Sequence, residues 1–206
     1  MAKYEPTFLA RVPVLSIIED IRKAVIDFVW GKSDIEGIKA DNVIKLGIML
    51  GIFLVLGAAI VGNIVYGIFS QILGNEIGLF LALAFTGFTA IYFVNPRVGK
   101  ADEEDVYLMP AIFIATITGS ALLLLLGQYI APISDFFAGI FGVRPEAASI
   151  IKSFLAASAI TVKSEVVTTT ITLLPVVGSY FLTAGTIALG GLVDFVIGEI
   201  KALTKK

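Results

Sequence analysis

Residues 46–75 read LGIMLGIFLVLGAAIVGNIVYGIFSQILGN, and these thirty residues include no charged side chain. As an α-helix, a segment of this length extends roughly 45 Å at about 1.5 Å per residue. The hydrocarbon layer of a bilayer is only roughly 30 Å thick. We therefore predict that a helix over about 46–73 crosses a membrane.

Three further segments of the chain lack charged residues over lengths that suit a membrane. They predict spanning helices at about 77–95, 106–129 and 168–193. The sequence GNE at 74–76 interrupts the first two charge-free runs and predicts a tight helical hairpin. The last run begins with β-branched residues, but we expect a helix there because an isolated strand leaves its backbone unpaired in lipid.

The composition supports the same interpretation and excludes some functions. Hydrophobic residues make up 57% of the 206-residue chain and charged residues 16%, whereas soluble domains contain about 25% charged residues. The formal net charge of −2 provides no basic excess to neutralise phosphates, so we expect no binding to nucleic acid. The sequence therefore predicts an all-α, polytopic integral membrane protein with the lipid bilayer as its surroundings.

The chain has neither cysteine nor histidine. This excludes thiolate and imidazole metal sites, cysteine nucleophiles, disulfides and the serine–histidine–aspartate triad. We therefore expect no cofactor, no metal site and no enzymatic activity. A membrane enzyme remains a distant alternative, because its acid–base group would have to be a carboxylate or a lysine.

Residues 13–30 predict an amphipathic helix within an N-terminal segment, 1–45, that precedes the first span. Its apolar residues follow one another mostly at spacings of three and four, and they are Val14, Ile17, Ile18, Ile21, Val25, Phe28 and Val29. Most of the opposite side is expected to be charged, with Glu19, Asp20, Arg22, Lys23 and Asp27. We expect this helix to lie in the plane of the lipid headgroups, and packing on a soluble partner is the alternative.

Residues 133–163 allow two interpretations. Their apolar pieces are short and are interrupted by Arg144, Lys152 and Lys163, so we expect interfacial or re-entrant helices here. A fifth transmembrane helix is the alternative. The bundle then covers residues 46–198, and 199–206 is expected to form a basic C-terminal tail.

Four spans place both termini on the same side of the membrane. That side would also carry most of the lysine and arginine residues, so the positive-inside rule makes both termini cytoplasmic. A fifth span would move the three C-terminal lysines to the opposite side, which favours four. We expect a multi-pass protein of the cell membrane, or of a viral membrane.

Four ionisable residues close to apolar sequence are candidates for an intramembrane polar or transport role, namely Lys152, Lys163, Glu165 and Asp194. An ionisable side chain inside a bilayer is costly and often functional. The structural alternative is that these residues lie at the membrane interface, where helices end.

Four small residues in the first span are candidates for close helix packing. Gly47 and Gly51 form a G-x-x-x-G pair, and Ala58 and Gly62 repeat the same spacing. Small residues let two helix backbones approach closely in a membrane.

Two functions remain open. The first is a non-enzymatic structural or accessory subunit that assembles with other membrane subunits or with copies of itself. The second is a small transporter or channel with the intramembrane lysine, glutamate and aspartate residues in its pathway. The amphipathic helix and the small-residue helix faces favour the subunit.

Overall fold

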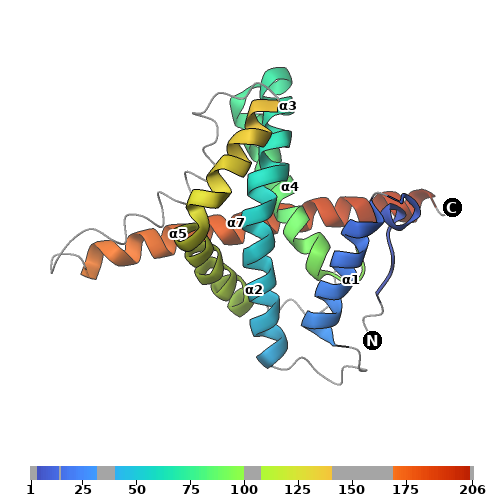
Figure 1. The fold of residues 1–206 in the computed structure, drawn as a ribbon, viewed down its shortest axis with the longest axis horizontal. Coiled ribbons are helices and arrows are strands. Elements are labelled where there is room, and N and C mark those ends of the chain that lie inside the picture. Colours follow the sequence, from blue (N-terminus) through green and yellow to red (C-terminus); the bar gives the residue numbers. More distant parts are fainter. Residues whose placement is uncertain (1–3, 14, 32–39, 100–107, 141–168, 205–206) are drawn as a thin grey trace.

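The computed structural model describes residues 4–13, 15–31, 40–99, 108–140 and 169–204. Every regular element within these ranges is a helix, so the all-α prediction is confirmed for the described chain. The elements in order are η1 (Phe8–Arg11), α1 (Ser16–Trp30), α2 (Ala40–Gly57), η2 (Ala58–Gly62), α3 (Asn63–Leu73), α4 (Asn75–Val94), α5 (Leu108–Ile140) and α7 (Thr169–Thr204) (Figure 1).

Helices α2 and α3 form one continuous helical segment of 34 residues, Ala40–Leu73. It begins before residue 46, where the predicted span starts, because its polar first turns are also stabilised as a helix. Lys45 pairs with Asp41 one turn away. Asn42 donates a 2.6 Å hydrogen bond to the carbonyl of Val29 at the end of α1. The helix therefore begins within the N-terminal segment, 1–45, that was expected to precede the first span.

A π-helical turn, η2, joins α2 to α3. A π turn bonds residue i to i+5, so it contains one residue more than an α turn. Ala58, Ala59 and Gly62 of this turn are buried. Small residues at these positions let the wider turn pack inside the bundle.

The hairpin predicted at 74–76 is present between α3 and α4. Gly74 has φ of +90°, a conformation that glycine adopts without strain, and its N–H donates to the carbonyl of Ser70. Gly78 then lies directly against Ser70, so the two helices separate only gradually from the turn.

Helix α5 is longer than predicted. It continues through Pro132 to Ile140, although the sequence predicted an end near residue 129 and separate short helices from 133. Apolar surroundings explain the difference. Inside a membrane protein, neighbouring groups can bind the backbone groups that a proline leaves unpaired, so a helix can continue through it. The helix bends by 63° between Leu108–Leu123 and Leu125–Phe137.

Helix α7 also exceeds its prediction, because it runs 36 residues to Thr204. The expected tail from 199 is therefore helical as far as it is described. Lys201 Nζ donates a 2.8 Å hydrogen bond to the carbonyl of Val98. This contact fastens the end of α7 to the loop that follows α4.

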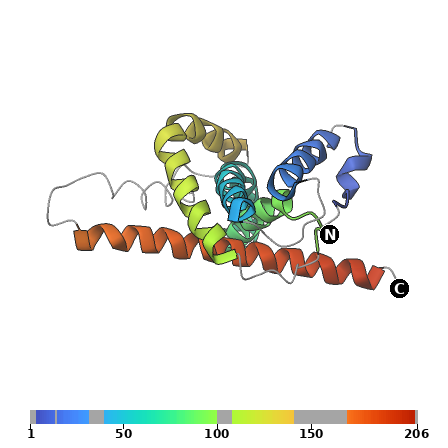
Figure 2. The ribbon, with the colours of Figure 1, turned by 90° about the horizontal axis from the view of Figure 1, so that it is seen from below.

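Helix α7 runs across α2 rather than alongside it. Figure 1 shows α2 upright with α7 horizontal behind it, and Figure 2 shows α2 end-on while α7 is still seen along its length. Three described helices are long and apolar enough to cross a membrane, or four if the bent α5 is one span. The sequence predicted the spans but not their relative directions, and α7 crosses α2.

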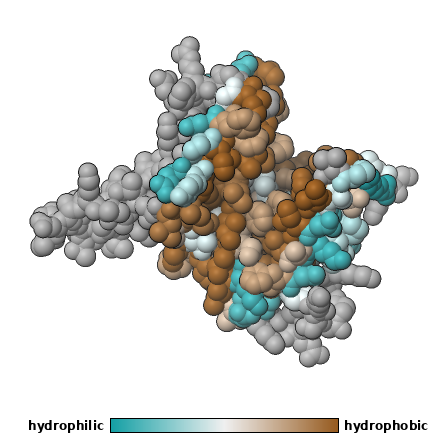
Figure 3. Space-filling view, viewed as in Figure 1, coloured by the Kyte–Doolittle hydropathy of each residue, from teal (hydrophilic) through white to brown (hydrophobic). Residues whose placement is uncertain are grey.

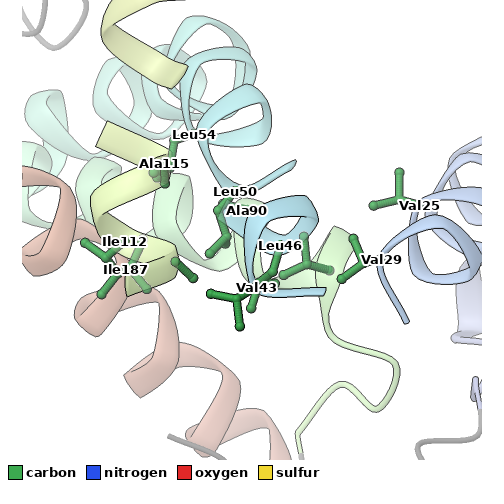
Figure 4. Close-up of a cluster of buried hydrophobic side chains, with 12 residues drawn as sticks. Val25, Val29, Val43, Leu46, Leu50, Leu54, Ala90, Ile112, Ala115 and Ile187 are labelled. Carbon is green, nitrogen blue, oxygen red and sulfur yellow. The ribbon is translucent and has the colours of Figure 1, made fainter. Parts of the chain in front are cut away.

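Apolar side chains hold the bundle together and also cover much of its surface. The main core combines side chains from α1, α2, α4, α5 and α7, including Val29, Leu50, Ala90, Ala115 and Ile187 (Figure 4). Figure 3 shows apolar surface across the middle of the molecule and hydrophilic residues over α1 and the lower end of α2. This distribution is compatible with a membrane protein.

Several predictions fall outside the described residues. Lys152, Lys163 and Glu165 are among them, together with most of 133–163 and the beginning of the last span. The choice between re-entrant helices and a fifth span therefore stays a prediction.

Candidate functional site

Five side chains form a polar cluster where α1 meets the C-terminal end of α4. They are Tyr4, Thr7, Glu19, Arg22 and Tyr92, and we call them the polar cluster. Arg22 is fully buried and Glu19 is 4% exposed. The two form a 2.8 Å ion pair within α1.

All five N–H donors of Arg22 are used, and most of them bind backbone carbonyls. Its Nε donates to Tyr92 and its Nη2 to Asn95 and Pro96, at 2.8 to 3.1 Å. Nη1 donates to the Glu5 carbonyl and to the Glu19 carboxylate. The guanidinium also lies over the Tyr92 ring, with its carbon 4.9 Å from the ring centre.

The end of α4 explains why a buried arginine fits here. The last carbonyls of a helix have no partner within it and carry partial negative charge, and Pro96 prevents the chain from supplying another N–H there. Arg22 fills this gap from α1. Trp30 Nε1 adds a 2.8 Å hydrogen bond to the carbonyl of Val94. Helix α1 is therefore a cap on α4.

Glu19 accepts hydrogen bonds at both of its oxygens. Oε1 accepts from Tyr4, from the backbone of Thr7 and from Arg22, and Oε2 accepts from the hydroxyls of Thr7 and Tyr92, at 2.7 to 3.0 Å. Burial raises the pKa of Glu19, but the hydrogen bonds from Tyr92, Tyr4 and Thr7 outweigh burial and lower the pKa to about 2. The carboxylate is therefore charged at neutral pH.

Tyr4 shows the opposite behaviour. Its burial and then its hydrogen bond to the Glu19 carboxylate raise the pKa of the phenol, so it remains a donor. Every charged atom of the cluster has a partner, and both carboxylate oxygens of Glu19 are already used by donors of the chain. Among the described residues there is likewise no group of three acidic or metal-ligating side chains.

The cluster reverses part of the predicted orientation of α1. Glu19 and Arg22 were expected on the polar side, but they face the bundle together with Val25, Ile26 and Val29. The apolar residues at the same spacing on the other side, Ile17, Ile21 and Phe28, are exposed. The helix is therefore amphipathic, but the bonds of its polar pair to the α4 terminus determine which side packs inward.

Asp194, a candidate intramembrane residue, also lies at this end of α4. It is buried, and its two oxygens accept hydrogen bonds from the N–H of Gly99 at 2.7 Å and from the side chain of Asn95 at 3.3 Å. These contacts join α7 to the turn after α4. They give both carboxylate oxygens of Asp194 a partner within its own chain.

Glycines let α7 cross α4 with the two backbones in contact. A Cβ atom on Gly87 would overlap the carbonyl of Thr186, and one on Gly190 would overlap the backbone of Gly87. The same close approach recurs between Gly198 and Gly99. This crossing could not be predicted from the spacing of small residues in the first span.

The four small residues predicted for packing all lie inside the described bundle. A Cβ on Gly47 would lie 2.5 Å from Ile114 Cβ, and one on Gly51 would lie 2.7 Å from the carbonyl oxygen of Ala115. Both glycines therefore face α5. Ala58 and Gly62 are buried in the π turn.

A small cavity of about 10 Å³ lies between α2, α5 and α7. Its polar lining comes from Thr116, Ser120 and Thr183, and its volume corresponds to about one water molecule. The hydroxyls of Thr116 and Thr183 donate to carbonyls one turn earlier in their own helices.

Sequence reasoning missed the polar cluster. The available signal was the acidic–basic pair at Glu19 and Arg22, three residues apart and flanked by apolar residues, together with the Asn-Pro stop at 95–96. No family model, curated protein or solved structure matches the chain.

Proposed function

We propose that the protein is a non-enzymatic structural subunit of a larger membrane assembly, and that α7 provides its contact with neighbouring membrane helices. The observation that carries this proposal is the exposed side of α7. Six of its residues, called the α7 stripe, follow one another at spacings of three and four, and all are exposed. They are Gly178, Phe181, Gly185, Ala188, Leu192 and Phe195.

The spacing of the α7 stripe is that of a helix that packs on another helix. Gly178 and Gly185 have open space where a side chain would be, whereas Phe181 and Phe195 are 67% and 58% exposed. Large side chains beside small gaps suit the knobs and holes of a partner helix better than they suit fluid lipid.

The buried charged side chains support the same proposal. The charges of Glu19, Arg22 and Asp194 bind groups of their own chain. The apolar stripe has no such internal partner. A chain in which these three buried charges bind internal partners, while an apolar side of one helix is exposed, is suited to assembly.

Single cysteines test this proposal cleanly, because the natural chain contains none. Ala188→Cys places a thiol on the α7 stripe, and Leu125→Cys places one on an exposed apolar position of α5 as the matched control. After oxidation in native membranes, we expect covalent adducts from position 188 and few from position 125. Equal adducts from both positions contradict the proposal. The proposal is also contradicted if position 188 gives no adduct and the particle has the size of a monomer.

A small transporter or channel is the second candidate, and the hydroxyl-lined cavity near Thr183 is the feature that favours it. The discriminating measurement is flux in reconstituted vesicles for Lys163→Gln, Glu165→Gln and Asp194→Asn. Altered flux with unchanged particle size supports transport. Absence of flux in the natural chain, with a defined larger particle, supports the subunit.

A further inference from the structure

A groove of about 400 Å³ runs between the N-terminal segment and the first two long helices. Its walls come from η1 and α1 on one side and from α2, the π turn and α4 on the other. Representative lining residues are Leu9, Ile18, Phe53, Val61 and Phe88. The groove is separate from the α7 stripe, so it raises a question that the proposed function does not answer.

The chemistry of the lining is that of a hydrocarbon site. No charged side chain lines the groove. Its hydroxyls belong to Thr89 and Tyr92, and both are engaged: Thr89 donates to the carbonyl of Phe85, and Tyr92 donates to Glu19. The groove therefore offers van der Waals contact and no polar bond, which selects an uncharged, apolar ligand.

The position of the groove identifies where such a ligand comes from. Phe53 and Val61 belong to Ala40–Leu73 and Phe88 to Asn75–Val94, two helices that are long and apolar enough to cross a membrane. The third wall, η1 and α1, is fastened to the end of α4 by the polar cluster. The groove thus extends along α2 and α4 toward the C-terminal end of α4.

The wall of the groove is also closely packed. Phe53 and Phe93 stack with ring centres 4.1 Å apart and nearly parallel planes, and the π turn places both Ile60 and Val61 at the groove. A preformed apolar groove that faces hydrocarbon accepts a chain without loss of internal contacts.

From these observations we propose that the groove binds one acyl chain of a bilayer lipid, which becomes a fixed part of the packing between α1 and the α2–α4 hairpin. The lipid chain fills a volume that the protein's own side chains leave open. This inference is independent of the proposed assembly through α7.

The test uses the full chain reconstituted in phosphatidylcholine vesicles that contain a trace of phosphatidylcholine with a diazirine in one acyl chain. After photolysis, peptide mapping locates the labelled residues. We expect label concentrated within 53–61 and 88–93. Val61→Trp fills the groove and should reduce that label about tenfold, because the acyl chain loses the space and the van der Waals contacts that the open groove offers.

Ile68→Trp is the matched control, because Ile68 is an exposed residue of α3 outside the groove lining, and it should leave the label unchanged. Leu56→Trp fills the same groove from α2 and provides a second variant if Val61→Trp folds poorly. Label spread evenly over exposed positions such as Leu125, or unaffected by both groove variants, means ordinary surrounding lipid and overturns the inference. Cross-linking through Ala188→Cys is unaffected by either result, so the two proposals can fail separately.

Discussion

Helices α1 and α7 both pack on α4, but through opposite kinds of contact. Helix α1 attaches through a buried arginine that binds the carbonyls at the α4 terminus. Helix α7 attaches mainly through glycines that let the two backbones touch. The polar contact is directional, so it permits only one position of α1 against α4. The glycine contact depends on shape, and it lets α7 cross α4 while its other side remains exposed.

The largest effect is expected from removing the arginine at the first contact. Arg22→Met leaves Glu19 buried without its cation and leaves the α4 carbonyls without donors, so the free energy of unfolding should fall by about 3–5 kcal/mol. Denaturant titration of the reconstituted chain measures this change. The matched control is Lys23→Met at the exposed neighbouring position, where a change within about 0.5 kcal/mol is expected. Equal losses in the two variants would mean that the cluster adds nothing specific.

The glycine contact should respond to one added methyl group. In Gly87→Ala the new Cβ overlaps the carbonyl of Thr186, so α7 has to shift and we expect a loss of about 2–3 kcal/mol. Gly185→Ala adds the same methyl group on the exposed side of α7, where no atom lies within 4 Å, and it should be neutral or slightly stabilising. A similar loss in both variants would show that the loss at Gly87 does not come from its close approach to α7.

Acid should release α1 while the glycine contact persists. The pKa of Glu19 is lowered from its ordinary 4.5 to about 2, so its carboxylate stabilises the fold above about pH 4.5. That contribution is lost as the pH falls from 4.5 toward 2. Trp30, the single tryptophan, caps Val94 and reports the docking of α1 through its fluorescence. The transition should disappear in Glu19→Gln, and its persistence there would assign it to another group.

The smallest effect is expected at the exposed end of α7. Lys201→Met removes the hydrogen bond to the carbonyl of Val98, but Lys201 is exposed, so water replaces the bond. We expect a loss below about 1 kcal/mol. A loss comparable to that of Gly87→Ala would show that this end, rather than the crossing, holds α7.

The helices could be predicted from the sequence because charge-free length is a local property. The runs at 46–75 and 77–96 and the break at Gly74 translate directly into α2, α3 and α4. The end of α5 was misplaced because Pro132 disfavours a helix in water, whereas packing and apolar surroundings let α5 continue. The end of α7 was misplaced because the end of the apolar run was taken as the end of the helix, although residues such as Lys201 are good helix formers.

The candidate site could not be predicted, for a different physical reason. Periodicity identifies the faces of α1, but it does not say which face packs inward. That choice depends on the carbonyls of Tyr92 and Asn95, about 70 positions along the chain, which only folding brings to Arg22. The crossing of α7 at Gly87 and Gly190 is a similar long-range match of two surfaces.

The π turn at Ala58–Gly62 changes the phase of the helix in which it lies. One additional residue in a helix rotates everything beyond it by about 100°. Gly47 and Gly51 before the turn can therefore face α5, while Gly67 beyond it takes a direction that an unbroken helix would not give it. Deleting one residue within 58–62 would turn all of α3 about its axis, although no side chain in α3 had been altered.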